Sequence, residues 1–490
     1  MNKIHKRPKT TLLILCGFTL LLNGCMVGPN YHRPDVNTPS SWAGQTGPQA
    51  AASQDARLIK WWADFNDSSF VSLIERAMKS NLDIKLAQER ILQARASRGV
   101  AAAGLWPTVD ATANYTRSRT PAPIGQRATV SNQFRTGWDA AWELDFFGGT
   151  RRNIEASDAD IRAAIEDRRD VLVTLIAEVA VNYAELRGFQ QRIIIAQDNL
   201  KAQQRNKEIV RQRFEGGFVS ALDLANAEAQ VATTLSQIPV LETSAQQSIY
   251  TIAVLLGQEP QSLLSELSPS APIPMTPPEI PAGLPSEILR RRPDIRRTEA
   301  QIHAATARIG VATADLFPKF NLTGSLGYRN TDPGALQQRD NFWSVGPSVD
   351  WQIFNMGRVG ANIEVQKALQ RQSMLSYKKT ILTALQDVEN ALIAYSKEKQ
   401  HQKFLMDAVA ANQKAVNLAT QLYTEGQTDF LSVLDAQRSL YVSEEALVLS
   451  TQNLVTDLIG LYKALGGGWD NESSNTIQDG NEPNSPVKSH

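Results

Sequence analysis

Cysteine is scarce in this sequence of 490 residues, which contains only Cys16 and Cys25. If the chain is cleaved before Cys25, one cysteine remains and no internal disulfide can form, so stability has to come from packing and assembly. Long apolar runs are also lacking. None of eighteen or more residues occurs beyond the N-terminus, which excludes a membrane-spanning helix in the body of the chain. The formal net charge is zero, and no nucleic-acid partner is expected.

Patterns of catalytic or ligand-binding residues are missing as well. The chain has no GxxxxGK[ST] phosphate loop, so nucleotide use is not expected. The histidines beyond the N-terminus are scattered without metal-ligand spacing: His32, His303, His401 and His490. The methionines do not cluster as a copper or silver site would require, and no arrangement of Ser, His and Asp indicates a triad. We therefore expect no enzyme activity, no catalytic residue, no metal site and no cofactor.

The first residues are typical of a bacterial lipoprotein signal peptide, predicted to cover residues 1–24. Basic residues precede a short apolar run, and LNGC then matches a lipobox that ends at Cys25. Lipid chains on Cys25, palmitate among them, would tether the mature chain to a membrane without spanning it. Met26 stands where an Asp usually signals retention in the inner membrane, which favours the outer membrane. The alternative is an ordinary signal peptide followed by a chance cysteine.

The chain aligns with itself at an offset of 209 to 211 residues. Landmarks recur in the same order, which indicates two copies of one structural unit. They include LWP and LFP (105–107 and 316–318), a Trp and a Gly six residues apart (142 and 148, 351 and 357), and FxxG and YxxG (214–217 and 423–426). The assignment is an N-terminal segment 25–80, repeat 1 at 81–257, a Pro-rich linker 258–291, repeat 2 at 292–466 and a polar, disordered tail 467–490.

Each repeat is predicted to contain a helix, two strands and a long helical hairpin. The strands, expected at about 108–118, 133–146, 319–329 and 342–354, alternate apolar and polar residues and carry four tryptophans. Such strands are typical of outer-membrane barrels, with one face toward lipid and one toward a lumen, although a soluble four-stranded sheet would alternate too. Four strands cannot close a barrel, so several chains have to build it together. A trimer would supply twelve strands, but the sequence requires only a multiple of four.

Two stretches, 151–216 and 357–426, contain no proline and almost no glycine. At ~1.5 Å per residue each would form a helix of about 100 Å, far longer than a globular core needs. Apolar residues spaced 4-3-4-3 in both predict packing against a neighbouring helix in a coiled coil. The chain is expected to reverse near 217 and 426, at the tips of two hairpins, and Pro239 to kink or break the first returning helix.

These features occur together with motifs that resemble a known family. CMVGPNYHRP (25–34), WWADFND (61–67), GLPSEILRRRPDIRRTEAQ (283–301) and the two tip motifs are similar to the TolC-like outer-membrane factor family. The similarity covers about residues 25–467. Within the family, the resemblance is to the lipoprotein branch (NodT-like) that serves resistance–nodulation–division (RND) efflux systems.

The resemblance implies a mainly α fold with a β-barrel. A trimer would form a twelve-stranded outer-membrane barrel continued by a periplasmic α-helical coiled-coil tunnel, with a mixed equatorial domain that includes 25–80 and 258–291. Members are passive exit ducts. The implied partners are two further copies in a homotrimer, a periplasmic membrane-fusion adaptor protein, an inner-membrane RND transporter and outer-membrane lipid. The chain would export small molecules, such as drugs or other toxic compounds, from the pump across the outer membrane.

The resemblance also implies that an adaptor docks at the hairpin tips. Ser220 and Asp429 follow the turn glycines and are residue types that cap helix N-termini. They would stop one helix and begin the next. The residues expected at the adaptor-docking surface are Gly216, Gly217, Ser220, Leu222, Gly426, Asp429 and Leu431.

A periplasmic gate is the second site that the resemblance implies. Asp435 and Arg438 lie on one helix face, and repeat 1 has Asn226 where repeat 2 has Asp435. The resemblance implies that three copies of Asp435 form a ring that lines the closed entrance. Arg438 and Tyr423 are expected to help hold that ring. The alternative is that Asp435 is a solvated residue on the helix surface.

Two other functions remain open from the sequence. One is the exit duct of a type I protein secretion system, over which the lipobox favours efflux. The other is a non-channel, lipid-anchored periplasmic scaffold, against which the tryptophan-bearing strands argue.

Overall fold

The computed structural model describes residues 25–37, 39–43, 58–121, 123–124, 127–274, 285–330 and 341–470. The predicted signal peptide and residues 471–490 of the predicted tail lie outside these ranges. The chain forms two compact units. Unit 1 comprises the chain up to Asp35, Arg90–Ile165 and Arg297–Lys378, and unit 2 comprises Val36–Glu89, Glu166–Arg296 and the chain from Lys379 onward. Each unit thus takes segments from both sequence repeats, so the repeats are not the compact units.

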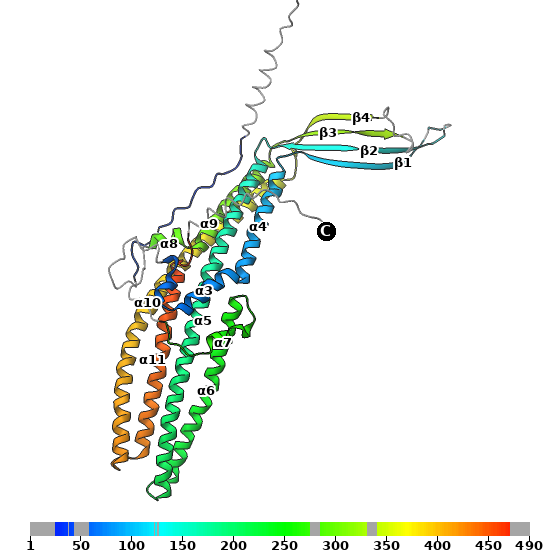
Figure 1. Ribbon diagram of the computed structural model, residues 1–490. Coiled ribbons are helices and arrows are strands. Elements are labelled where there is room, and N and C mark those ends of the chain that lie inside the picture. Colours follow the sequence, from blue (N-terminus) through cyan, green and yellow to red (C-terminus); the bar gives the residue numbers. More distant parts are fainter. Residues whose placement is uncertain are drawn as a thin grey trace, which may run out of the picture. The chain divides into compact units, whose positions relative to one another are not determined.

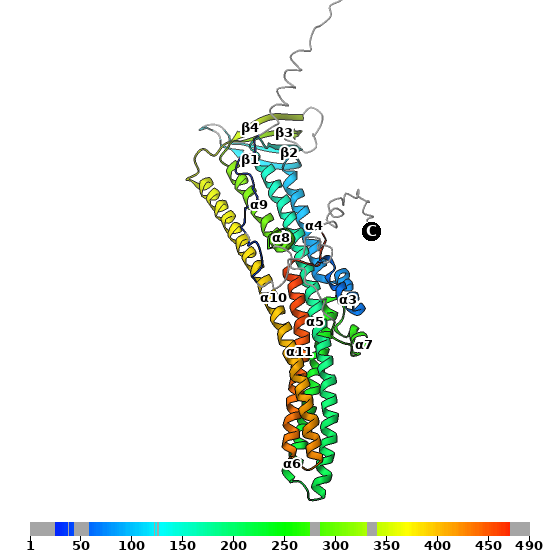
Figure 2. The ribbon, with the colours of Figure 1, turned by 90° about the vertical axis from the view of Figure 1, so that its left-hand side faces the viewer.

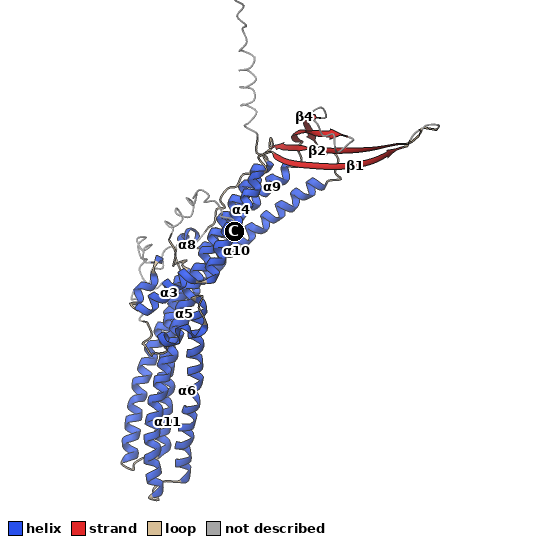
Figure 3. Ribbon diagram, turned by 45° about the vertical axis from the view of Figure 1, so that its right-hand side comes forward, coloured by secondary structure: helices blue, strands red, loops and turns tan. Residues whose placement is uncertain are grey.

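The first unit contains one antiparallel sheet of four strands in chain order: β1 (Thr108–Thr120), β2 (Thr129–Leu144), β3 (Lys319–Asn330) and β4 (Asn341–Asp350). Figure 1 shows the strands side by side, and Figure 3 shows them in red. The second strand begins earlier than the predicted 133, because its pairing with β1 continues to the Thr120–Thr129 pair. The fourth ends before the predicted 354, where its pairing with β3 ends at Lys319 and Asp350.

The pairing register gives the sheet two chemically different faces. In one row across all four strands, Ala111 lies opposite Trp138, Trp138 opposite Leu326, and Leu326 opposite Trp343. Residues two apart on a strand share a face, so this row belongs to an apolar face that also carries Val109, Tyr115, Trp142, Leu322 and Val345. The next row, Asp110, Asp139, Ser325 and Ser344, belongs to the opposite, polar face.

The second unit contains two antiparallel helical hairpins, shown in Figure 2. One joins the last part of α5 (Gly149–Glu215) to α6 (Ala221–Leu255), and the other joins the last part of α10 (Arg358–Thr424) to α11 (Phe430–Ala464). Helices α5 and α10 are both 67 residues long. Helix α6 continues through Pro239, so the predicted break at this proline is wrong.

Each strand pair follows one helix: α4 (Leu82–Ala103) precedes β1, and α9 (Pro293–Ala314) precedes β3. The shorter elements are η2 (Trp61–Phe65), α3 (Ser68–Ser80), η3 (Pro260–Leu263), α7 (Leu264–Leu267) and α8 (Pro285–Arg291). Aromatic packing forms the core of the second unit: Trp61 is stacked on Tyr462 with ring centroids 4.9 Å apart. Within the described ranges, none of the helices combines the length and apolar content that crossing a membrane requires.

The start of the predicted tail is ordered, so its expected disorder from residue 467 is wrong for the first few residues. Trp469 is buried, and the guanidinium groups of Arg169 and Arg296 lie 4.5 and 5.2 Å from its ring. Glu166 accepts from Arg169 at 2.5 Å and lies 2.9 Å from Arg296, which holds both cations against the indole. The polar composition of the later tail concealed this aromatic anchor.

Candidate functional site

The turn of the first hairpin ends α5 in a Schellman motif. Gly217 has a φ of 76°, its amide donates to the carbonyl of Phe214 at 2.9 Å, and the amide of Phe218 donates to the carbonyl of Arg213 at 2.8 Å. Helix α6 then begins with a capping box, in which the Ser220 hydroxyl accepts from the amide of Asp223. The Asp223 carboxylate accepts in return from the amide of Ser220 at 3.0 Å.

The second tip repeats this geometry. Gly426 also has a φ of 76°; its amide donates to the Tyr423 carbonyl at 3.0 Å, and the amide of Gln427 to the Leu422 carbonyl at 2.8 Å. The carboxylate of Asp429 caps α11 by accepting from the amide and the hydroxyl of Ser432, at 3.0 and 2.7 Å. Hydrogen bonds from the hydroxyl and amide of Ser432 lower the pKa of Asp429.

The predicted docking residues lie at exposed ends of these hairpins. Leu222 is 68% exposed and Leu431 51% exposed, although both are apolar. Next to the turn, Phe218 is 83% exposed; its ring carbons lie 2.8–2.9 Å from the position of a Cβ built on Gly216. Phe218 falls within the first turn motif, 216–222, which was predicted to be part of the docking surface, although it was not singled out there. Phe218, Leu222 and Leu431 are thus apolar side chains exposed at the ends of the hairpins.

Tyr423, one of the predicted gate residues, is buried in the second unit. It packs in an apolar cluster with Val210, Ala227, Phe430, Val433 and Leu434. Arg213, on the other hairpin, lies over the Tyr423 ring at 4.5 Å and donates to the carbonyls of Tyr423 and Thr424 at 2.9 and 3.1 Å. Its charge therefore neutralises the carbonyl end of α10. Sequence reasoning missed Arg213, because no local pattern reveals a partner about 210 residues away.

The other two predicted gate residues, Asp435 and Arg438, are both exposed on α11. In the described chain, no ion pair joins them, and the guanidinium of Arg438 lies 3.5 Å from the Gln230 side-chain oxygen. The structure thus brings Arg213, rather than Arg438, into contact with Tyr423. Asp435 lies on the helix surface of the single chain.

Cys25, the predicted lipidation site, is exposed, and the segment that follows it is held firmly within the first unit. The amide of Val27 donates to the carbonyl of Phe147, just after β2, at 3.1 Å. The buried guanidinium of Arg152 donates to the carbonyls of Val27 and Gly28 at 3.0 and 3.3 Å. These contacts fix the segment after Cys25 beside the end of the sheet that leads into α5.

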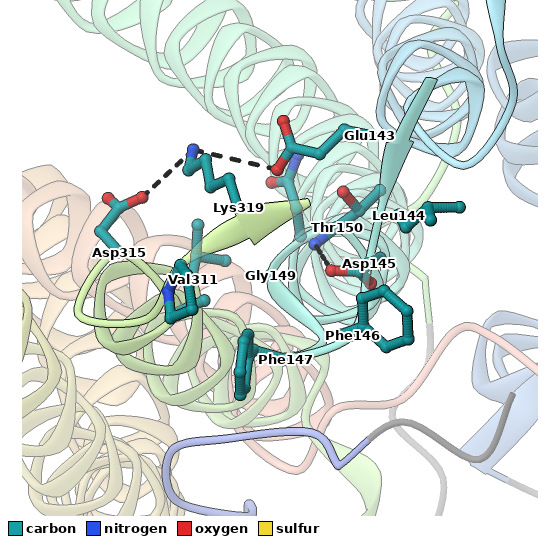
Figure 4. Close-up of a pocket in the computed structure, with 13 residues that line it drawn as sticks. Glu143, Leu144, Asp145, Phe146, Phe147, Gly149, Thr150, Val311, Asp315 and Lys319 are labelled. Carbon is teal, nitrogen blue, oxygen red and sulfur yellow. Dashed lines mark hydrogen bonds and ion pairs between the residues drawn. The ribbon is translucent and has the colours of Figure 1, made fainter. Parts of the chain in front are cut away.

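A small cavity of about 250 Å³ lies at the same end of the sheet and is shown in Figure 4. Its charges are already paired. Lys319 lies 3.4 Å from Asp315 and 4.0 Å from Glu143, and the carboxylate of Asp145 accepts from the amides at the start of α5. Over the described ranges, no group of three or more His, Cys, Asp or Glu residues is arranged to hold a metal ion. This cavity is therefore a structural junction between strands and helices.

Comparison with known proteins places these features in a family. Residues 73–258 and 284–467 match the family model "Outer membrane efflux protein". The two matched ranges follow the two repeats recognised in the sequence, which confirms the predicted resemblance.

Individual relatives span nearly the whole chain. Nodulation protein T of Rhizobium leguminosarum bv. trifolii is 32% identical over 92% of this chain and 96% of its own length. The pyoverdine export outer membrane protein OpmQ of Pseudomonas aeruginosa is 33% identical over 94% of this chain and 97% of its own length. The solved structure of the outer-membrane channel OprN superposes with a TM-score of 0.85 at 36% identity, covering 91% of this chain and all of that chain.

Proposed function

The chain belongs to the outer membrane efflux protein family, and from this premise we propose that it is a passive exit duct of a tripartite RND-type efflux system. It would conduct small molecules from an inner-membrane RND transporter, joined by a periplasmic adaptor, across the outer membrane. Relatives named for pyoverdine export and for toluene efflux favour small molecules over proteins as cargo. Transport, not catalysis, is the activity.

The observation that carries this proposal is the two-faced sheet joined to paired long helices. One face presents tryptophan, leucine and valine side chains, as strands facing lipid do, and the other presents polar side chains, as strands facing water do. In the single chain, β1 and β4 are the edges of the sheet. An open edge is not tolerated in lipid, so β4 of one copy would pair with β1 of the next. Three copies would close a twelve-stranded barrel with a water-filled lumen.

Asp435 is proposed as the periplasmic gate. Around a threefold axis, three exposed carboxylates would attract cations and would repel one another. Because this repulsion opposes closure, other contacts have to hold the entrance closed. Tyr423 supports such a role because Arg213 clamps it, and with it the end of α10, in each copy. Arg438, exposed one turn beyond Asp435, would then contact a neighbouring copy.

Docking of the adaptor is proposed at the hairpin tips. Phe218, Leu222 and Leu431 would supply apolar contact area, and the glycine turns would let the adaptor approach the backbone closely, because nothing lies within 4 Å of a Cβ built at Gly217 or Gly426. The lipid on Cys25 is proposed as a second attachment to the outer membrane, beside the sheet.

The proposal is tested by reconstituting the purified mature protein into a planar lipid bilayer. We expect trimers that resist SDS and stepwise ion conductance. A monomeric protein without conductance would instead support the scaffold function. Deletion of the gene should raise susceptibility to small toxic compounds and leave protein secretion unchanged, whereas loss of a secreted protein would support the secretion function.

A further inference from the structure

Charge is distributed unequally over the two faces of the sheet. On the polar face, charged residues occur along much of the strands: Asp110, Arg135, Asp139, Glu143, Lys319, Arg329 and Asp350. On the apolar face, the described strands carry only Arg117 and Arg119. Both are basic, and both lie at the hairpin end of β1, away from the end that joins the helices.

The surroundings of these two arginines leave their charge uncompensated. Arg117 lies opposite Asn132, Arg119 lies opposite Val130, and both arginines are exposed. Among the described residues, no carboxylate forms an ion pair with either guanidinium. Below them on the same face is Tyr115, whose ring centroid lies 4.6 Å from that of Phe134 and whose hydroxyl donates to Asn132 at 3.2 Å. An aromatic pair thus separates the arginines from the apolar rows.

The position of the arginines along the strands matches the edge of a membrane. At ~3.4 Å per residue, the distance along β2 from Trp142 to Asn132 is about 34 Å, and a strand tilt of ~40° reduces it to about 26 Å across the membrane. The apolar band of outer-membrane barrels is ~25 Å tall and is flanked by aromatic residues. Arg117 therefore lies at the outer edge of this band, and Arg119 lies beyond it, at the level of lipid headgroups.

We infer that Arg117 and Arg119 bind the phosphate groups of anionic lipid in the outer leaflet. The inference rests on the proposed function, because only a membrane-spanning sheet presents this face to lipid. A guanidinium binds phosphate through two parallel hydrogen bonds, and side chains two residues apart on one strand face lie about 7 Å apart, so both can engage one diphosphorylated headgroup. Solvation alone would not require a positive charge at either position. On this face, the described strands carry no acidic residue that would compete with lipid phosphate for the guanidinium groups.

The test uses the full mature protein in nanodiscs of phosphatidylcholine that contain diphosphorylated lipid A. After repurification in detergent, native mass spectrometry counts the lipid A retained by the wild type and by the Arg117→Gln/Arg119→Gln variant. An arginine near a membrane surface contributes about fivefold to the binding of anionic lipid, so the double variant should bind lipid A about 25-fold more weakly. Retention by the wild type should also fall at high salt. The Arg117→Lys/Arg119→Lys variant, which keeps charge but loses the paired hydrogen bonds, should bind with intermediate strength.

The matched control is Arg329→Gln, which removes the same charge from the polar face, where Arg329 lies 5.1 Å from the Phe342 ring. It should retain lipid A like the wild type. Equal retention by the double variant, or equal retention of dephosphorylated lipid A, would overturn the inference. Planar-bilayer conductance separates the two proposals. If the wild type conducts and the double variant retains as much lipid A as the wild type, only the arginine site is refuted. If the wild type does not conduct, the duct is refuted as well.

Discussion

At the scale of single residues, the tip depends on contacts between the two repeats that neither repeat makes alone. Repeat 1 supplies Arg213, and repeat 2 supplies Tyr423 and the carbonyls that the arginine caps. Repeat 2 has Leu422 at the position equivalent to Arg213, so repeat 2 has no matching arginine to cap the end of α5 in return. A charge-assisted hydrogen bond to carbonyls at a helix end is stronger than an exposed ion pair, so Arg213 links the hairpins together with the apolar cluster around Tyr423.

Replacing Arg213 should loosen the second tip. The Arg213→Ala variant loses two charge-assisted hydrogen bonds and the contact with the Tyr423 ring, so opening of the end of α10 should become easier by about 1.5 kcal/mol or more. Amide hydrogen exchange around residues 422–430 should then become at least about tenfold faster. The control is Arg211→Ala on the same helix, where an exposed pair with Glu208 contributes little. Equal exchange in the two variants would refute the clamp.

Asp435 is the residue whose charge should set ion selectivity. The Asp435→Asn variant keeps the shape of the side chain but removes the proposed ring of charge, which attracts cations, so we expect a smaller single-channel conductance and a weaker preference for cations. Planar-bilayer recordings with asymmetric salt measure both. Asp407→Asn, an exposed carboxylate on α10, provides the comparison for a general loss of negative charge. Wild-type conductance and selectivity in Asp435→Asn would return Asp435 to the role of a solvated surface residue.

At the scale of elements, both hairpins end and restart their helices by the same means. A glycine with a φ of 76° makes the Schellman hydrogen bonds, and a Ser or Asp three residues later caps the next helix. The tips differ in the chemistry of the cap. Repeat 1 uses a hydroxyl and a reciprocal capping box, and repeat 2 uses a carboxylate that the two groups of Ser432 hold.

Substitutions at the turn glycines can separate backbone strain from docking. In Gly426→Val a β-branched residue must adopt a positive φ, which costs about 1–2 kcal/mol or more and should disturb the tip. In Gly426→Asn the backbone is tolerated and only bulk is added, because the space around the Cβ is open. If the tip docks an adaptor, Gly426→Asn should reduce efflux while SDS-resistant trimers persist. Full efflux in cells that carry Gly426→Asn would remove this turn from the docking surface.

The cap of α11 should respond to acid. The folded pKa of Asp429 is lowered, so its contribution to stability is present above the unfolded value of about 3.9 and is lost as the pH falls through the folded pKa. Amide exchange at the start of α11, corrected for the intrinsic effect of pH, should therefore accelerate in that window. Asn is also a good N-cap and does not titrate there, so Asp429→Asn should abolish the dependence. A dependence that survives in Asp429→Asn would assign it to another carboxyl.

At the scale of the whole molecule, the proposed membrane insertion depends on the difference between the two faces of the sheet. A charge placed on the lipid side near the middle of the membrane costs about 2–4 kcal/mol, whereas the lumen side tolerates it. Leu326 and Ser325 are neighbours on β3 that lie on opposite faces, opposite Trp138 and Asp139. A sheet with both faces in water would not distinguish them in this way.

The pair of variants Leu326→Arg and Ser325→Arg uses this difference. Leu326→Arg should lower the stability of the protein in lipid vesicles by about 2–4 kcal/mol and reduce the yield of inserted trimer, while Ser325→Arg should remain close to the wild type. Urea unfolding in vesicles, followed by tryptophan fluorescence, measures both. Equal effects of the two substitutions would show that neither face contacts lipid, and the proposed barrel would fail.

The sequence by itself determined the features that depend on near neighbours in the chain. Period-two alternation specified which residues share a strand face, the absence of proline specified the long helices, and glycine and cap residues specified the turns, because each is a local conformational preference. The offset between the repeats showed that these elements occur twice. The outward position of Arg117 and Arg119 follows from alternation once the strand is established.

Only the tertiary structure decided which distant residues meet. It brought Arg213 into contact with Tyr423, Arg152 into contact with the carbonyls after Cys25, and both Arg169 and Arg296 against Trp469. It also showed that both compact units combine segments from both repeats. These contacts depend on packing geometry and on charges that find partners far along the chain, and no periodicity in one sequence carries that information.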